Sequence, residues 1–508
     1  MSDSSVCDAR IRSITILIFN LIARLFGKMR TAKLILIVLI SATALSSRAD
    51  DVWNSGFLFD DVPLTLAPGH RTEILGPLFY SEERDLEKTW AVPPLVSHHT
   101  DAGTDSEEWD YLYPIASLDR FGTEYRWHIF QLFSFAGGEN QEQEKARRFT
   151  LFPIYFQQRS EDTNQNYTAI VPFYGHLKKR LLRDEISFVM FPLYSETRKK
   201  DIVTRNYVYP FFHLRHGNKL EGWQFWPFVG HEHKEVTTAT NGFGDVTEIG
   251  GHDNRFILWP IYLNAYLETG TTNEQHQQAV LPLYSLQRSP QRDSTTVIWP
   301  FFTHITDREK KYTEWELPWP LVVFARGEGK ITSRVWPFFS QAQSTNLESA
   351  FYLWPVYKYN RVHGELVDRD RTRILFFLYS DIHQKNLETS KAQRRVDFWP
   401  LFTHRRDYNG STRLQVLSIL EPLVPNSKSI ERDYSPLWAL WRSEKNTVTD
   451  ARSQSLLWNL YRRDTTPDSK KCSLLFGLFQ YQSNSGGKRL RLFYIPVVKT
   501  KPAAEAVK

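Results

Sequence analysis

The sequence predicts an all-β fold built from tandem antiparallel hairpin repeats. A short hydrophobic-Pro-hydrophobic-aromatic motif returns about every 20 residues, and polar turn signals lie between successive copies. Aromatic residues make up 14% of the chain, with 16 Trp, 23 Tyr and 34 Phe, and these side chains favour strands over helices. Because we place each motif at the centre of one strand, we expect about 20 strands.

The repeat motif has two main forms. The first is exemplified by Phe152-Pro153-Ile154-Tyr155, and in the second Trp precedes the proline, as in Trp336-Pro337. Some copies lose the proline, as in Trp458-Asn459-Leu460-Tyr461. We therefore predict that the proline marks a bent mid-strand point that donates no hydrogen bond. The residues assigned to this structural repeat are Pro153, Pro172, Pro192, Pro210, Trp226, Pro227, Trp259, Pro260, Trp299, Pro300, Trp336, Pro337, Trp354, Pro355, Trp399 and Pro400.

Turn signals midway between motifs predict hairpins. Gly217-Asn218-Lys219 and Asn409-Gly410 are typical, and alternating residues flank them. Alternate residues of a strand point to opposite faces of its sheet. Around Pro337, the residues of both faces are apolar over about five positions. This pattern predicts a sheet whose two faces are both covered by protein at the motif.

Two closed architectures fit such a meander, because an open sheet of this size would leave long exposed edges. One is a propeller-like or stacked-sheet array. The alternative is a large outer-membrane β-barrel, because the expected number of strands and the residues per strand also suit a wide barrel. Apolar residues at mid-strand on the inward face and a proline in nearly every strand argue against the barrel. We therefore favour the closed array.

The N-terminal region predicts export. Residues 29–49 have the layout of a secretory signal peptide, with a positive start, an apolar run at 34–40 and a small-x-small cleavage site at 47–49. The alternative, a membrane anchor, is less favoured because the run is shorter than the roughly 20 residues that span a bilayer. The expected location is the periplasm, the outer membrane or the extracellular space.

The remaining boundaries follow from these signals. Residues 1–28 are interpreted as a misassigned start, with translation beginning at Met29, or as an N-terminal extension. Residues 50–110 fit the repeat poorly and are expected to form a cap or irregular segment. The aromatic-Pro β-repeat domain is predicted to span 111–498, followed by a polar tail at 499–508.

Composition limits the partners. The 63 basic and 57 acidic residues nearly cancel and are interleaved, leaving a formal net charge of +6. No dense basic stripe is present, so nucleic acid is not an expected partner. The two cysteines, Cys7 and Cys472, cannot support a disulfide framework.

Histidines are the only candidate metal ligands. His231 and His233 form the one compact pair, as His-Glu-His. His176, His304 and His404 also follow prolines, but they belong to distant strands. Tight ligand spacing is missing, so neither a metal ion nor another cofactor is expected.

Candidate enzymatic residues are few. The acidic run Asp105, Glu107, Glu108 and Asp110 could supply the paired carboxylates of a glycosidase, but a solvated loop explains it more simply. The aromatic residues could stack on sugars, although their regular positions favour a structural role. No phosphate loop or nucleophile motif is present in the sequence, so no catalytic or cofactor-binding residue is assigned.

The leading functional hypothesis is an exported, non-enzymatic scaffold or binding module of the cell envelope. Envelope glycans or proteins are possible partners, and membrane contact stays open. The alternatives are an outer-membrane β-barrel for transport or envelope assembly and a carbohydrate-active enzyme.

Overall fold

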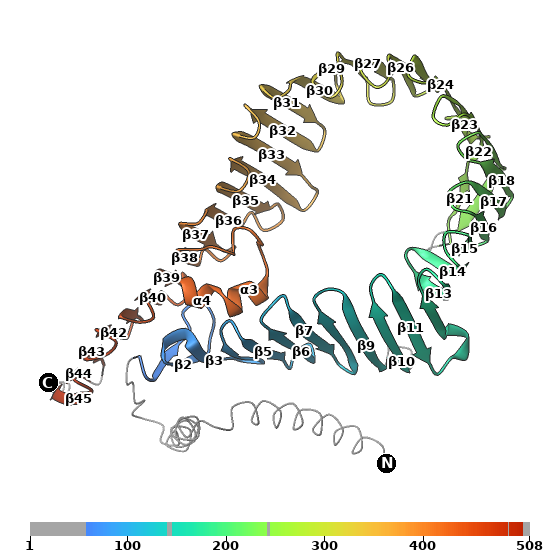
Figure 1. The fold of residues 1–508 in the computed structure, drawn as a ribbon. Helices are drawn as coiled ribbons and strands as arrows, with labels where there is room; N and C mark the ends of the chain where they lie inside the picture. The colour runs from blue at the N-terminus through green and yellow to red at the C-terminus, as the bar shows by residue number, and fades with distance from the viewer. Residues whose placement is uncertain (1–56, 140–144, 241–243, 486, 501–508) are drawn as a thin grey trace. The chain divides into compact units, whose positions relative to one another are not determined.

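The computed structural model describes residues 57–139, 145–240, 244–485 and 487–500, which belong to the compact unit Ser55–Lys508. These residues form 45 strands and a few short helices. Forty-three strands make one antiparallel sheet, and β20 and β21 form a separate two-stranded sheet. The all-β, antiparallel prediction is therefore confirmed (Figure 1). The predicted signal peptide, the N-terminal extension and residues 501–508 of the tail lie outside the described residues.

The strands are short, usually about six residues or roughly 20 Å long. The first group is β1 (Asp60–Pro63), β2 (His70–Ile74), β3 (Phe79–Arg84), β4 (Glu87–Val92), β5 (Val96–Asp101), β6 (Ser106–Tyr111), β7 (Ala116–Phe121), β8 (Glu124–Ile129), β9 (Phe133–Glu139), β10 (Lys145–Leu151), β11 (Tyr155–Ser160), β12 (Tyr167–Ile170), β13 (Tyr174–Arg180), β14 (Arg183–Val189), β15 (Tyr194–Lys199), β16 (Ile202–Tyr207), β17 (Phe212–Gly217), β18 (Leu220–Phe225), β19 (Val229–Lys234), β20 (Thr237–Thr240), β21 (Val246–Ile249) and β22 (Gly251–Ile257).

The second group completes the sheet. It is β23 (Tyr262–Thr269), β24 (Gln275–Val280), β25 (Tyr284–Arg288), β26 (Arg292–Val297), β27 (Phe302–Asp307), β28 (Tyr312–Glu316), β29 (Val322–Gly327), β30 (Lys330–Val335), β31 (Phe339–Ser344), β32 (Leu347–Tyr352), β33 (Tyr357–His363), β34 (Val367–Ile374), β35 (Tyr379–Asn386), β36 (Ala392–Phe398), β37 (Phe402–Arg406), β38 (Thr412–Val416), β39 (Trp441–Lys445), β40 (Arg452–Leu456), β41 (Tyr461–Thr465), β42 (Ser469–Leu474), β43 (Phe479–Asn484), β44 (Gly487–Leu492) and β45 (Ile495–Thr500).

Four short helices interrupt the described strands. They are η1 (Gly76–Leu78), η2 (Thr163–Gln165), α3 (Lys428–Asp433) and α4 (Ser435–Trp438). The side chain of Ser427 caps α3 by accepting a hydrogen bond from the Ile430 amide. Pro436 lies in the first turn of α4, where a missing N–H is tolerated.

Each strand pairs with the next one along the chain. The exception is the β20–β21 hairpin, which is inserted between β19 and β22 while those two strands pair directly. No ladder joins β45 to β1, and no closed barrel or propeller is found among the described residues. The predicted closed array and the alternative barrel are therefore both wrong for this part of the chain.

The predicted mid-strand position of the prolines is also wrong. Pro153 lies in the turn between β10 and β11, and Pro337 lies in the turn between β30 and β31. Fifteen X-Pro peptide bonds are cis. The same correction applies to Pro172, Pro192, Pro210, Pro227, Pro260, Pro300, Pro355 and Pro400 and to the tryptophans of the motif, Trp226, Trp259, Trp299, Trp336, Trp354 and Trp399.

This correction doubles the number of strands. The polar turn at Gly217–Lys219 joins β17 to β18 as predicted. The motif turns at 208–211 and 226–228 lie at the other ends of these two strands. One period of about 20 residues is therefore two strands and two turns. The expectation of about 20 strands is replaced by 45.

Residues 57–110 differ from the irregular cap that we expected. They contain β1 to β6, which pair in order and continue into β7. The lower regularity of the motif in this segment hides strands of the same kind.

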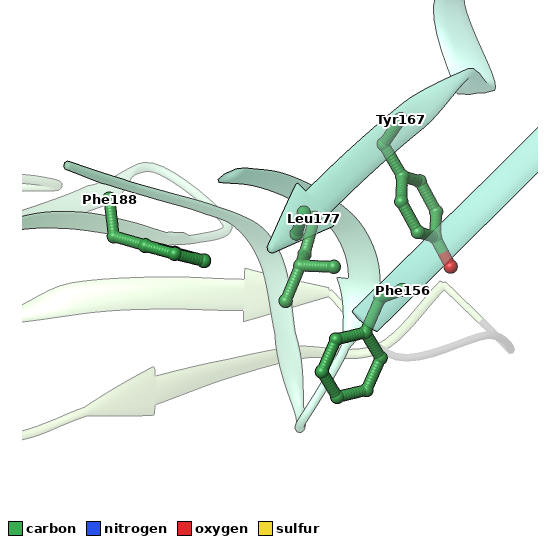
Figure 2. Close-up of a cluster of buried hydrophobic side chains, with 5 residues drawn as sticks. Phe156, Tyr167, Leu177 and Phe188 are labelled. Carbon is green, nitrogen blue, oxygen red and sulfur yellow. The ribbon is translucent and has the colours of Figure 1, made fainter. Parts of the chain in front are cut away.

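The largest buried apolar cluster lies on one face of β11 to β14. Phe156, Tyr167, Leu177 and Phe188 contribute its large side chains (Figure 2). Gly175 lies between them, and a Cβ atom there would approach the Phe188 ring to 2.6 Å. Elsewhere the buried face is mostly small and polar, with Thr332 and Ser340 almost fully buried.

Candidate functional site: the apolar edge

The motif turns all lie along one edge of the sheet. Motif turns and polar turns alternate along the main ladder, except at the β20–β21 hairpin and at the insertion between β38 and β39. We call the set of motif turns the apolar edge. Its turns are residues 93–95, 112–115, 130–132, 152–154, 171–173, 190–193, 208–211, 226–228, 258–261, 281–283, 298–301, 317–321, 336–338, 353–356, 375–378, 399–401, 457–460 and 475–478.

The apolar edge carries no Asp, Glu, Lys, Arg or His in any of these turns. Apart from tyrosines and the tryptophan indoles, its polar side chains are Gln131 and Asn459. Large apolar side chains nevertheless face outward, including Trp299 at 47%, Phe338 at 61% and Leu283 at 64% exposure. Protein does not cover both sides of the motif, contrary to the prediction from sequence.

The strand ends next to these turns extend the apolar zone. From β11 to β27, the residues that flank the turns pair across the ladder as one continuous row. The row contains aliphatic and aromatic residues throughout. Its members are Tyr155, Ile170, Tyr174, Val189, Tyr194, Tyr207, Phe212, Phe225, Val229, Ile257, Tyr262, Val280, Tyr284, Val297 and Phe302.

The adjacent row on the opposite face is also free of Asp, Glu, Lys and Arg between β11 and β27. It runs from Phe156 through Ser195 and Gln224 to Thr303. Its histidine is His213, whose pKa burial lowers below the usual value, so the neutral ring is favoured. Both faces of the sheet are therefore uncharged at neutral pH beside this part of the apolar edge.

The opposite edge has the contrary chemistry. We call its turns the polar edge. Its turn at 308–311 reads Arg-Glu-Lys-Lys, and the turn at 200–201 reads Lys-Asp. Arg308 also pairs with Asp293 at 2.8 Å. The short strands thus separate an uncharged edge from a charged one.

The backbone of the apolar edge satisfies its own donors. In the turn at 298–301, the Ile298 amide donates to Leu283 at 2.7 Å and the Trp299 amide donates to Pro282 at 2.9 Å. The Phe301 amide donates to Ile298 at 2.9 Å within the turn. Proline supplies no donor. All backbone N–H groups of the turns at 190–193, 208–211, 226–228, 258–261, 281–283 and 298–301 are bonded in this way.

A second feature interrupts the apolar edge at residues 417–440. This insertion carries α3 and α4, which lie beside the N-terminal strands (Figure 1). Arg432 donates to Ser97 at 2.9 Å and to Glu108 at 3.2 Å, and it also bonds Asp110. The Tyr80 hydroxyl donates to the Arg432 carbonyl at 2.9 Å.

Asp433 lies beside this arginine and is only 1% exposed. Burial raises the pKa of Asp433 to about 7, and the nearby carboxylate of Asp110 acts in the same direction. The acidic run at 105–110 is therefore not a solvated loop. Its residues Glu107, Glu108 and Asp110 lie on β6, and Asp110 is buried against α3.

A charged cavity of about 140 Å³ lies next to the insertion. Arg71, Glu73, Arg442, Glu444 and Arg462 line it. Burial opposes ionisation of Glu73, but Arg71 and Arg462 hold its pKa below the usual value. Glu73 also accepts a hydrogen bond from Asn459 at 2.6 Å. The ion pairs Arg442–Glu444 and Arg462–Asp464 each lie within one strand, and the hydrogen bond from Asn459 joins β2 to the turn between β40 and β41.

The histidine candidates are only partly brought together. His231 and His233 both approach one oxygen of Asp253, at 3.2 and 3.3 Å. Burial opposes ionisation of Asp253, but hydrogen bonds from Arg255 and His231 lower its pKa. His176, His304 and His404 lie on β13, β27 and β37, which are not neighbouring strands. The described residues contain no group of three or more side chains suited to a metal ion.

Sequence reasoning missed the apolar edge and Arg432. The uncharged character of every motif was a usable signal for the edge. Successive residues of a mid-strand segment would point to opposite faces of the sheet, and one of these faces commonly meets water and carries charged residues. For the insertion, the signal was the gap between Trp399-Pro400 and Trp458, the longest interruption of the motif. Nothing in the sequence indicated which strand Arg432 would contact.

The chain matches no protein-family model and no curated protein. Within the described residues, none of the helices has the length and apolar character needed to cross a bilayer.

Proposed function

We propose that this protein is an exported, non-enzymatic scaffold or binding protein of the cell envelope and that its apolar edge is the contact surface. The single observation that supports this proposal is the repetition of exposed, uncharged turns along one edge of the sheet. Exposed apolar surface of this extent is typical of an interaction site. The signal-like layout of residues 29–49 supports the location.

The contact surface is tested by cysteine labelling in envelope fragments. Cys7 and Cys472 are first replaced by serine, and Phe301→Cys is compared with Leu182→Cys on the polar edge. We expect a water-soluble maleimide to label position 301 at least ten-fold more slowly than position 182, because a partner covers the apolar edge. After denaturation both positions should react equally. Equal labelling in the native envelope would overturn the proposed contact surface.

Export is tested on the same preparations. The chain recovered from the envelope should begin after Ala49, as read by N-terminal sequencing. Replacing Leu36 and Leu39 by Arg should leave the precursor in the cytoplasm, because it interrupts the apolar run. A chain that stays cytoplasmic with residues 29–49 intact would contradict the proposed location.

A further inference from the structure

We propose that the occupant of the apolar edge is the acyl region of one lipid leaflet, with the stretch from β11 to β27 inserted edge-on. This inference rests on the proposed function, since it names the partner of the same surface. The argument uses the backbone, the side-chain chemistry and the dimensions of this stretch.

The backbone is suited to a medium without water. Every N–H group in the motif turns between Met190 and Phe301 has a hydrogen-bond acceptor within the protein, and proline removes the remaining donor. In hydrocarbon no water can bond an unpaired N–H, which is therefore strongly unfavourable. Turns of the polar edge also bond N–H groups, as the Arg308 amide does to Gln291 at 2.7 Å. The pairing therefore permits contact with hydrocarbon, and the side chains and dimensions select it.

The side chains favour a fluid apolar solvent over a protein partner. The turns at 190–193, 208–211 and 298–301 read Met-Phe-Pro-Leu, Val-Tyr-Pro-Phe and Ile-Trp-Pro-Phe. These turns share apolar character but not shape. A protein interface requires matched shapes and about one hydrogen bond per 100–200 Å², whereas lipid requires only apolar character. The Trp and Tyr residues here are also those that anchor proteins at a membrane interface.

The dimensions and charges restrict insertion to one leaflet. Six-residue strands extend about 20 Å, less than the roughly 30 Å hydrocarbon core of a bilayer. The uncharged zone comprises the turn and the last two residues of each adjoining strand, about 10 Å in depth. This depth fits the 5–10 Å typical of interfacial insertion. The charged turns at 200–201 and 308–311 would stay in water.

The test uses the chain from Asp50 onward, which contains the whole compact unit Ser55–Lys508. The protein is mixed with protein-free phosphatidylcholine vesicles and floated through a density gradient at low salt and in 1 M salt. We expect most of the protein to float under both conditions, because the contact is apolar and the headgroups carry no net charge. Brominated acyl chains should quench its tryptophan fluorescence, whereas headgroup-restricted quenchers should not.

Matched variants locate the contact. Phe173→Lys, Phe228→Lys and Phe301→Lys together place charges on the apolar edge, where these side chains are 59%, 49% and 45% exposed. This variant should lower the vesicle-bound fraction at least ten-fold. Leu181→Lys, Leu182→Lys and Val246→Lys add the same charge on the polar-edge side, where the side chains are also exposed, and should leave flotation unchanged.

Several outcomes would overturn the lipid inference. They are the absence of flotation, equal flotation of the two triple variants, or a lipid-free oligomer that only the apolar-edge variant dissociates. The last result would identify a second copy of this chain as the occupant. Bromolipid quenching of the unmodified protein needs no variant, so it stays informative if a variant misfolds. Protection of position 301 in the envelope without vesicle binding would leave the proposed function standing and remove only the lipid.

Discussion

Strands β11–β14 and strands β3–β6 belong to the same ladder, but their buried faces contact different partners. In β11–β14, each apolar side chain packs against residues of adjacent strands, as Leu177 and Phe188 do. In β3–β6, the buried face contacts α3, and Arg432 lies 335 residues from its partner Ser97. The first arrangement can be repeated along a chain, whereas the second occurs where a long insertion returns to the N-terminal strands.

The difference also concerns the type of interaction. A nearest-neighbour array gains stability in small local increments from each interface. The contact with α3 depends on a few buried charges, and a buried charge is costly when its partner is removed. We therefore expect mutations to have local, moderate effects in β11–β14 and large effects at α3.

The largest expected effect is that of Arg432→Met. The substitution leaves Asp110 buried without its cation, so the α3 contact should lose about 3–5 kcal/mol. Hydrogen exchange of the α3 amides measures this loss locally. A local measurement is needed because a large array need not unfold in one step. Arg394→Met is the control, because it breaks a 2.6 Å pair with Asp381 in which the arginine side chain is 53% exposed, and it should cost less than about 1 kcal/mol. Equal losses at the two sites would contradict this comparison.

The next effect is a pH dependence from Asp433. Its pKa is near 3.8 in the unfolded chain and about 7 in the folded protein. Between these values the folded state binds the extra proton, so the α3 contact should weaken as pH rises from about 4 to about 7. The full shift corresponds to at most about 4 kcal/mol.

Asp433→Asn tests the sign of this dependence. The amide cannot ionise, so exchange protection of α3 should become nearly independent of pH in that window. Amides of β13 and β14 in the same sample serve as the internal reference. Protection that rises with pH in the unmodified protein would show that Asp433 is ionised in the folded state.

A smaller effect is expected from Leu177→Ala. Leu177 is 2% exposed within the β11–β14 cluster, and truncation of such a side chain costs about 2–4 kcal/mol. The lower part of this range is expected here, because the cluster is small and can relax around the cavity. Leu182→Ala, at a 92% exposed position, should change stability by less than about 0.5 kcal/mol. Loss of protection at α3 in the Leu177 variant would show that the two parts of the ladder unfold together.

Several features could be predicted without coordinates. The aromatic content and the polar turn signals, such as Gly217–Lys219, were sufficient for an all-β antiparallel meander. This prediction succeeded because turn chemistry and strand pairing between chain neighbours are local properties.

The motif itself was misread for a physical reason. A proline can end a strand or interrupt it. Both interpretations give the same spacing between prolines along the sequence. The structure places Pro153 and its equivalents in turns, as it does the motifs without proline. That placement moves Trp299 and Phe301 from an expected interior to an exposed edge.

Local chain chemistry thus specified the strands, the polar turns and the apolar character of each motif, since these depend on residues a few positions apart. The alignment of all motif turns on one edge followed only once each short strand was known to join a motif turn to a polar turn. The contacts of Arg432 and Asp433 with β5 and β6 needed three dimensions for a different reason. A buried ion pair between segments more than 300 residues apart leaves no periodic signal, because its geometry is fixed by packing and not by spacing along the chain.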